Sequence, residues 1–269
     1  MNAPPEIGQF QEAVVLAWAG SDEMINPVER LAIFLPALGV GGAERVMLKL
    51  AQGLVTHGFA VDLVLARAEG PLLAEVPEKA RVVKLEASGV LPSLPALICY
   101  LRRERPKALL SVLHGNVVAT WARRLAGVST RVVVSERNAL SCMTQYYASD
   151  LRMRLTPQLT RWFYPWADGI VAVSKGVADD LAQVAGIPRE RIQVIYNPIV
   201  TPELAAKAKV PLQHPWFGPG QPSVILSVGR LTAQKDFPTL IQAFARVRQD
   251  RAIRLLILGE GEERPALEA

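Results

Sequence analysis

From Leu31 onward, short apolar runs alternate with stretches of helical periodicity, and this alternation restricts the fold more than any other feature of the chain. The apolar runs cover residues 31–36, 61–66, 81–85, 108–113, 131–136, 169–174 and 191–196. Helical patterns occupy residues 43–57, 93–105, 116–126 and 175–185, with a helical or broken helical stretch over 150–166. Strands this apolar belong in parallel sheets that helices cover on both faces. The sequence therefore predicts a doubly wound, Rossmann-like α/β domain.

A second alternation begins after a segment that holds five prolines between residues 201 and 222. Residues 223–228 and 255–258 are predicted strands on either side of a helical pattern, and each ends in a glycine turn. We expect residues 1–29 to be an N-terminal extension, 30–200 the first domain, 201–222 the interdomain connection and 223–269 the beginning of a second Rossmann-like domain. One helix cannot cover both faces of such strands. We therefore expect the second domain to be incomplete in this chain.

The overall composition excludes several classes of protein. The chain of 269 residues has a formal charge of +5 and no long run of Lys or Arg, which argues against nucleic-acid binding. Cys99 and Cys142 form neither a metal-binding spacing nor a disulfide framework, which favours a reducing cytoplasm. Residues 1–13 contain no Lys or Arg, so the charged start of a secretory signal is missing. No apolar run reaches the ~18 residues of a membrane span, and peripheral membrane attachment stays open.

Three loops at predicted strand ends are candidate sites in the first domain, because open parallel sheets bind ligands there. The glycines of Gly39-Val-Gly-Gly-Ala-Glu44 allow close approach, and the helix that follows favours anions. This is a poor dinucleotide fingerprint, since Glu44 replaces its third glycine and Asp62 lies inside the second strand. A tight turn without a ligand fits equally well.

His114-Gly-Asn116 and Ser135-Glu-Arg-Asn138 follow two further strands. Histidine is the side chain best suited to exchange a proton near neutral pH, although a structural hydrogen bond is the commoner role. A carboxylate beside an arginine can hold a sugar hydroxyl or a phosphate. A solvated loop is the alternative for residues 135–138.

Basic and aromatic residues are mixed in the segment from Asp150 to Trp166. Such a mixture suits the interface of an anionic membrane. The alternative is that the aromatic rings pack on the domain and the arginines face outward.

The second domain carries the sharpest signal. Gly229-Arg230 follows one strand, Lys235 lies close behind, and Gly259-Glu260-Gly261 follows the next strand. A glycine turn with two nearby cations and a helix start is a good clamp for a diphosphate.

Together these motifs resemble those of glycosyltransferase family 4, which has the GT-B architecture of two facing Rossmann-like domains. The matching segments are Gly41–Arg45, Ala167–Ser174, Val194–Pro198, Gly229–Asp236 and Leu258–Gly261. The resemblance implies a retaining hexosyltransferase that uses a nucleotide-sugar donor, a UDP- or GDP-sugar, and a glycan or lipid-linked acceptor. Products would be cell-surface polysaccharide such as lipopolysaccharide. The enzyme would be cytoplasmic, with peripheral contact at the inner face of the plasma membrane through Asp150–Trp166.

The resemblance also implies roles for individual residues. Arg230 and Lys235 would grip the donor diphosphate and stabilise charge on the departing nucleotide. The donor would further be contacted by Gly41, Gly42, Gly229, Gly259, Glu260 and Gly261. The acceptor side would be formed by His114, Asn116, Glu136, Arg137 and Asn138. No metal is expected, in agreement with the lack of an Asp-x-Asp sequence.

One departure from the family pattern concerns activity. In the family, a Glu-x7-Glu motif lies in the second domain at a position that would fall after Ala269. We therefore expect little or no turnover by this chain. A nicotinamide-dependent oxidoreductase and a non-catalytic binding domain are the alternatives. Glu44 and the position of Asp62 argue against the first of these.

Overall fold

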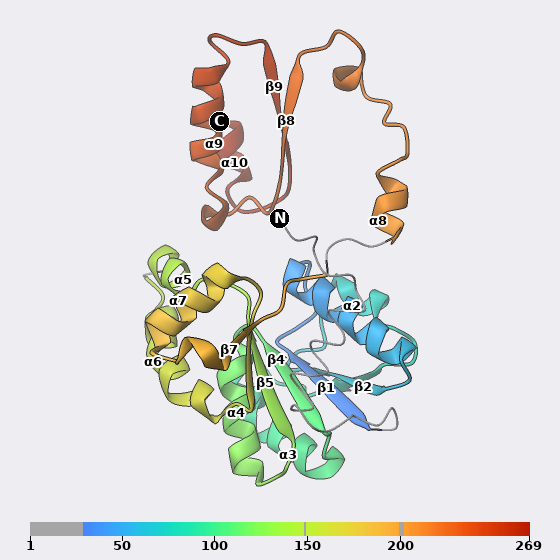
Figure 1. Ribbon diagram of the computed structural model, residues 1–269, viewed down its shortest axis with the longest axis vertical. Helices are drawn as coiled ribbons and strands as arrows, with labels where there is room; N and C mark the ends of the chain where they lie inside the picture. The colour runs from blue at the N-terminus through green and yellow to red at the C-terminus, as the bar shows by residue number, and fades with distance from the viewer. Residues whose placement is uncertain (1–28, 148, 199–201) are drawn as a thin grey trace. The chain divides into compact units, whose positions relative to one another are not determined.

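The computed structural model describes residues 29–147, 149–198 and 202–269 (Figure 1). The chain divides into two compact units, Met1–Thr201 and Pro202–Ala269. The expected N-terminal extension lies outside the described residues except for Glu29. Residues 202–222, expected to be a connection, group with the second unit.

A sheet of seven parallel strands forms the first unit, in the order β3-β2-β1-β4-β5-β6-β7. The strands are β1 (Arg30–Leu35), β2 (Ala60–Leu65), β3 (Arg81–Lys84), β4 (Ala108–Val112), β5 (Arg131–Glu136), β6 (Gly169–Ala172) and β7 (Ile192–Val194). The predicted doubly wound α/β fold is confirmed. The strand order reverses between β1 and β4, which makes this the topological switch point of the sheet.

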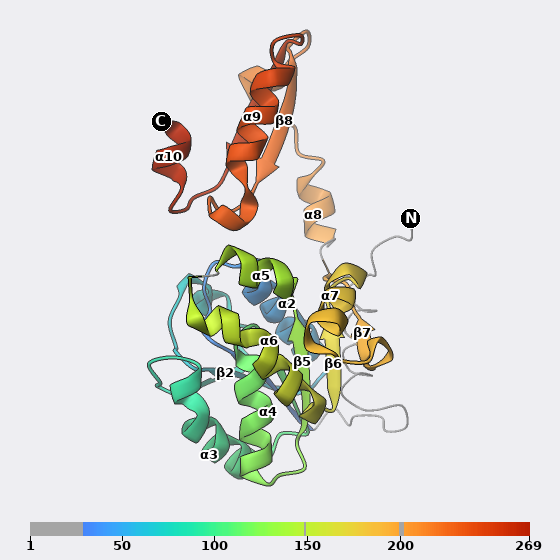
Figure 2. The same cartoon turned by 90° about the vertical axis from the view of Figure 1, so that its left-hand side faces the viewer.

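Helices cover both faces of this sheet because successive strand residues point to opposite sides. Leu31, Ile33 and Leu35 of β1 join one core with α2 (Gly42–Thr56) and the short 3-10 helix η1 (Pro71–Glu75). Ala32 and Phe34 join the other core, which α3 (Leu94–Glu104), α4 (Gly115–Ala126) and α7 (Lys175–Ala185) cover. Figure 2 shows α3 and α4 in front of the strands and α6 (Leu151–Phe163) on the outside of this layer.

Helix α5 (Leu140–Tyr146) was not predicted. Its seven residues are too few to show a clear period, and a tertiary contact supports its first turn. The backbone N–H of Ser141 donates to Asp180 Oδ2 at 3.3 Å, and the Ser141 hydroxyl donates to the same carboxylate. Asp180 belongs to α7, so this helix depends on a residue 39 positions away.

The second unit is a βαβ arrangement. Strands β8 (Ser223–Val228) and β9 (Ile253–Leu258) are parallel, and α9 (Phe237–Val247) connects them. The short helices α8 (Pro202–Lys207), η5 (Pro215–Phe217), η6 (Ala233–Lys235) and α10 (Arg264–Glu268) complete it. The glycine turns predicted after both strands are present at the carboxyl ends of β8 and β9.

A buried carboxylate holds the amino end of the large sheet together. Asp62 of β2 is fully buried, and its Oδ1 accepts a hydrogen bond from Arg30 Nη1 at 2.6 Å. Its Oδ2 accepts from Arg81 Nη2 at 2.6 Å and from Tyr100 Oη at 2.7 Å. Burial and the nearby Asp62 charge both raise the pKa of Tyr100, so its hydroxyl stays a donor. Asp62 therefore ties β1, β3 and α3 to β2.

We expect Asp62→Ala to lower the free energy of unfolding by about 3 kcal/mol, because it leaves the cluster without its buried anion. This loss is at the lower end of the range for breaking a buried ion pair, since the Arg30 and Arg81 side chains are 35% and 43% exposed and water can solvate them. Urea denaturation followed by circular dichroism measures it.

Arg103→Ala is the control, because Arg103 is largely exposed and pairs with the neighbouring Glu104. It should change stability by less than about 0.5 kcal/mol. Equal effects of the two substitutions would contradict a structural role for Asp62.

Candidate functional site

The loops after β1 and β4 flank the switch point of the large sheet. The first is the glycine loop over residues 39–42, which leads into α2, and the second is the turn at Leu113 and His114, which leads into α4. Open parallel sheets bind ligands in the crevice between such loops. The carboxyl ends of β5 and β7 reach the same edge, because all seven strands are parallel.

The two adjacent glycines of the first loop have different surroundings. A Cβ atom at Gly41 would lie 2.3 Å from Glu44 Oε2, because the Glu44 side chain folds back over the start of α2. A Cβ atom at Gly42 would meet nothing within 4 Å. Gly42 therefore presents open backbone at this edge, while Gly41 makes room for the Glu44 carboxylate.

The turn after β4 presents His114 to solvent. Leu113 has a φ of 57°, a left-handed conformation that is rare for a leucine and costs free energy. A Cβ atom at Gly115 would lie 2.9 Å from Ser111 Oγ, so only glycine fits beneath the turn. Partial desolvation lowers the pKa of His114, and Asp150 opposes this shift. The imidazole is consequently neutral at pH 7 and can accept or donate a hydrogen bond.

Three side chains behind this turn form a buried network. Asn116 Nδ2 donates to Tyr164 Oη at 2.8 Å and to the Ser135 carbonyl oxygen at 3.1 Å. Tyr164 Oη donates to Glu136 Oε2 at 2.8 Å. Asn116 is 1% and Glu136 is 6% exposed. The direct acceptor contact expected of these two residues does not fit their burial, because their side chains bond inside the unit.

The network changes the ionisation of Glu136. Burial raises the pKa of this carboxyl to about 6, while the hydrogen bonds from Tyr164 and from the backbone of Arg137 and Asn138 act against the rise. No arginine or lysine hydrogen bond to this carboxylate is present among the described residues. Glu136 is therefore a buried anion that neutral donors hold.

Arg137 lies partly exposed at the same edge. Its Nη2 donates to Asn197 Oδ1, just beyond β7, and its Nη1 lies 3.5 Å from Ser135 Oγ. Burial lowers its pKa to about 10, and the charges of Glu136 and Glu44 oppose the shift. Arg137 remains a cation at pH 7. Of the predicted acceptor-side residues, His114, Arg137 and Asn138 are the ones with exposed surface.

The predicted donor residues of the second unit lie together at the ends of β8 and β9. The backbone N–H of Leu231 donates to the Glu260 carbonyl oxygen at 2.9 Å, which joins the two glycine turns. A Cβ atom at Gly259 would lie 1.9 Å from the Gly229 carbonyl oxygen, and one at Gly261 would lie 2.2 Å from that of Leu231. Both positions therefore require glycine.

The two cations of this cluster are accessible. Arg230 and Lys235 are exposed, and the Lys235 stem lies beside Gly229. The Glu260 side chain turns toward the helix that follows and pairs with Arg264. The segment that forms these turns therefore carries two accessible positive charges. The structure thus assembles the predicted site residues as two clusters, one in each unit.

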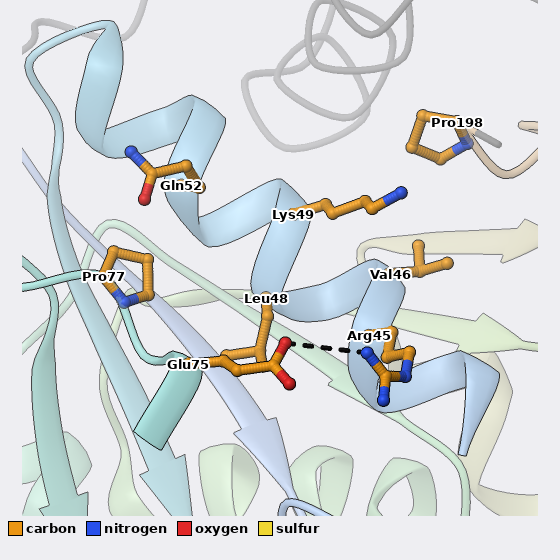
Figure 3. A pocket seen from close by; sticks show the side chains of 8 residues that line it. All are labelled: Arg45, Val46, Leu48, Lys49, Gln52, Glu75, Pro77 and Pro198. Carbon is orange, nitrogen blue, oxygen red and sulfur yellow. Dashed lines mark ion pairs between the residues drawn. The ribbon is translucent and has the colours of Figure 1, made fainter. Parts of the chain in front are cut away.

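A pocket of about 400 Å³ lies beside α2 and was not predicted (Figure 3). Its lining residues are Arg45, Val46, Leu48, Lys49, Gln52, Glu75, Pro77 and Pro198. Figure 3 shows Arg45 directed toward Glu75, to which it pairs at 3.6 Å, and Lys49 extended toward Pro198. The pocket joins three segments that are distant in sequence, so no local pattern marks it.

Residues 29–147, 149–198 and 202–269 contain no group of three or more His, Cys, Asp or Glu side chains that could hold a metal ion. Within the same residues, no helix is both long enough and apolar enough to cross a membrane.

Comparison with known proteins identifies the family. Residues 40–202 match the family model described as Glycosyltransferase Family 4, and residues 214–269 match Glycosyl transferases group 1. The chain belongs to glycosyltransferase family 4. The family resemblance drawn from its motifs is confirmed. The oxidoreductase alternative gains no support, and the Asp62 carboxylate, whose position inside β2 already argued against it, is buried and bonded to two arginines.

Two curated relatives extend the match. The chain is 32% identical over 248 residues to an N-acetylgalactosamine-N,N'-diacetylbacillosaminyl-diphospho-undecaprenol 4-alpha-N-acetylgalactosaminyltransferase of Campylobacter jejuni. It is 28% identical over 234 residues to the lipopolysaccharide core biosynthesis glycosyltransferase LpsE of Rhizobium meliloti. These alignments cover 87% and 84% of this chain, but 63% and 58% of the relatives. The chain thus spans less than two thirds of their length.

Solved structures of low sequence identity show the same fold. A glycosyltransferase from Rickettsia africae matches with a TM-score of 0.58 at 17% identity, over 90% of this chain and 63% of that one. Sucrose-phosphate synthase from Thermosynechococcus elongatus matches with a TM-score of 0.61 at 15% identity, over 88% and 63%. The chain therefore has the GT-B type of α/β architecture.

The raised pKa of Glu136 predicts a specific pH dependence of stability. When the pKa of a carboxyl is higher in the folded than in the unfolded state, its ionised form destabilises the fold. Protonation removes this destabilisation as pH falls through 6. Relative to Glu136→Gln, the wild type should gain about 1 kcal/mol of stability between pH 7 and pH 5. Urea denaturation at each pH gives this difference.

Glu104→Gln is the matched control, because Arg81 lowers the pKa of Glu104 and moves its titration below this pH range. It should leave the dependence between pH 7 and pH 5 unchanged. If the wild type and Glu136→Gln lose or gain stability in parallel, Glu136 does not titrate as proposed.

Proposed function

We propose that this protein takes part in the transfer of a sugar from a nucleotide-sugar donor to a glycan or lipid-linked acceptor during the building of a cell-surface polysaccharide. Family membership and the two relatives support this proposal. The observation that carries it is the cluster at the ends of β8 and β9, where two close-packed glycine turns lie beside Arg230 and Lys235.

In this proposal the second unit binds the donor. The glycine turns allow a nucleotide to approach the backbone, and the two cations pair with its diphosphate. During transfer, the bond between the anomeric carbon and the diphosphate oxygen breaks, and a bond to an acceptor oxygen forms as the proton of that oxygen passes to the departing diphosphate. Arg230 and Lys235 stabilise the negative charge that the departing nucleotide gains.

The first unit is proposed to bind the acceptor at its carboxyl edge. The exposed, neutral imidazole of His114 can bond a sugar hydroxyl, and Arg137 can bond an oxygen that carries negative charge. Gly42, which is expected to contact the donor, leaves its backbone open at the same edge. These groups come from three different strand ends of one sheet.

Nucleotide binding tests the donor cluster. We expect the full chain to bind UDP or GDP in isothermal titration, and Arg230→Ala or Lys235→Ala to weaken binding about tenfold, because each removes a charge-assisted hydrogen bond. Arg248→Ala, which removes an exposed arginine after α9, should have no such effect. No binding of either nucleotide, or equal binding by all variants, would refute the proposed donor cluster.

The outer face of α6 supports a finer proposal, contact with an anionic membrane. Leu151, Leu155 and Trp162 lie on one face of this helix and are 64%, 48% and 64% exposed. Arg154 and Arg161 are exposed beside them. Phe163 instead packs against Trp121 and Trp166, with ring centroids 5.8 and 4.9 Å away. We propose that the apolar stripe enters the headgroup region and that the arginines meet anionic lipids.

Vesicle binding tests this stripe. The combined substitution Leu151→Ala and Trp162→Ala should reduce co-sedimentation with phosphatidylglycerol vesicles about tenfold, because it removes most of the exposed apolar area. Tyr196→Ala, which removes another exposed aromatic ring beyond β7, is the control and should bind as the wild type does. Unchanged sedimentation of the double variant would reject α6 as the membrane contact.

A further inference from the structure

The Tyr164 hydroxyl lies between the two loops that are proposed to meet the acceptor. Tyr164 is buried and belongs to the 3-10 helix η3 (Tyr164–Trp166), which follows α6. Its hydroxyl accepts a hydrogen bond from Asn116 and donates one to Glu136. Thr160, one turn earlier in α6, bonds to the same oxygen. One buried oxygen therefore links α4, β5 and α6.

Through Asn116, the Tyr164 hydroxyl is connected to the turn that holds His114. Asn116 is the second residue of α4, and its backbone N–H donates to the Leu113 carbonyl oxygen at 3.4 Å. Leu113 holds the strained left-handed conformation of the turn. The Asn116 side chain is anchored on Tyr164 and on the Ser135 carbonyl oxygen. Asn116 thereby fixes the turn that presents His114.

Through Glu136, the same hydroxyl is connected to the loop that holds Arg137. While Oε2 of Glu136 accepts from Tyr164, Oε1 accepts from the backbone N–H of Arg137 at 3.2 Å, and the backbone of Asn138 bonds to the same carboxylate. Glu136 thereby fixes the start of the loop that presents Arg137 and Asn138.

We propose that Tyr164 is a positioning residue whose hydroxyl couples the turn that presents His114 to the loop that presents Arg137. The proposal rests on the proposed function, in which both loops meet the acceptor. Because the hydroxyl bonds to both anchors at once, neither loop can rearrange without breaking a bond that also supports the other. The acceptor then meets His114 and Arg137 in one relative arrangement, a condition for efficient transfer.

Three charged side chains of the described residues act on this network and on the groups it positions. Arg137 faces Glu136 from the loop after β5, and Glu44 of α2 faces Arg137. Asp150, just before α6, faces His114. Protonation of Glu136 removes the anion that accepts the Tyr164 hydrogen bond, so a pH change near 6 should reach the His114 turn through Asn116.

Amide hydrogen exchange with Tyr164→Phe tests the coupling. This variant keeps the buried ring and removes only the hydroxyl. We expect exchange to speed up about tenfold at both Asn116 and Arg137, by similar factors, and the His114 ring resonances to move. Histidine spectra are simple, because the chain has three histidines and His57 and His214 serve as internal references.

Tyr100→Phe is a matched control, because Tyr100 Oη also donates to a buried carboxylate, that of Asp62, at the opposite end of the sheet. It should leave exchange at Asn116 and Arg137, and the His114 resonances, unchanged. If Tyr164→Phe affects one loop alone, or neither, the loops are independent and the proposal is overturned. An equal response to Tyr100→Phe overturns it as well.

A second measurement applies if Tyr164→Phe does not fold. In the wild type, the protection of the Asn116 amide, corrected for intrinsic exchange, should show a step near pH 6, and Glu136→Gln should abolish it. A step at Arg137 without one at Asn116 overturns the coupling. Neither measurement requires a nucleotide or an acceptor, so failed nucleotide binding with intact coupling would refute the proposed function alone.

Discussion

The structure of the first unit depends on the parallel pairing of strands that are buried on both faces. Helices cover both faces of such a sheet, so its strands are mostly apolar and a ligand can reach the sheet only from an end. The parallel direction brings the loops after β1, β4, β5 and β7 to the same end. The reversal of strand order between β1 and β4 then opens a crevice between their loops. This constraint places the glycine loop, His114 and Arg137 at one edge.

A buried carboxylate lies at each end of the sheet, and the two carboxylates differ in the charge of their hydrogen-bond donors. At the amino end, Asp62 accepts from two arginines and a tyrosine, and the cluster closes that end. At the carboxyl end, Glu136 accepts from Tyr164 and backbone N–H groups, and burial raises its pKa. A carboxylate between cations stays ionised and stabilises the fold. A buried carboxylate whose donors are neutral takes up a proton at mildly acidic pH. The strained turn at Leu113 lies at this second end, where free energy is stored at the proposed acceptor side.

The second unit relies on backbone contacts. Its two glycine turns approach so closely that a side chain at Gly259 or Gly261 would overlap a carbonyl oxygen. This packing leaves the stem of Lys235 beside Gly229 and leaves Arg230 exposed. The two exposed cations therefore lie in the segment where the two glycine turns meet, which is why the proposed donor site is placed there.

The sequence by itself determined the strands, most helices and the family, because apolar periodicity and glycine turns are local signals. It also predicted that Gly229, Arg230, Lys235 and Gly261 gather at one edge, since they follow strands that pair with each other. Only the tertiary structure decided that Asn116 and Glu136 are buried and that Tyr164 joins them. Glu136 and Tyr164 lie 28 residues apart, and no local pattern records a hydrogen bond between them. Helix α5 was missed for the same reason, since Asp180 supports it from α7. Pairing across the fold depends on where the strands place each side chain, which periodicity alone does not specify.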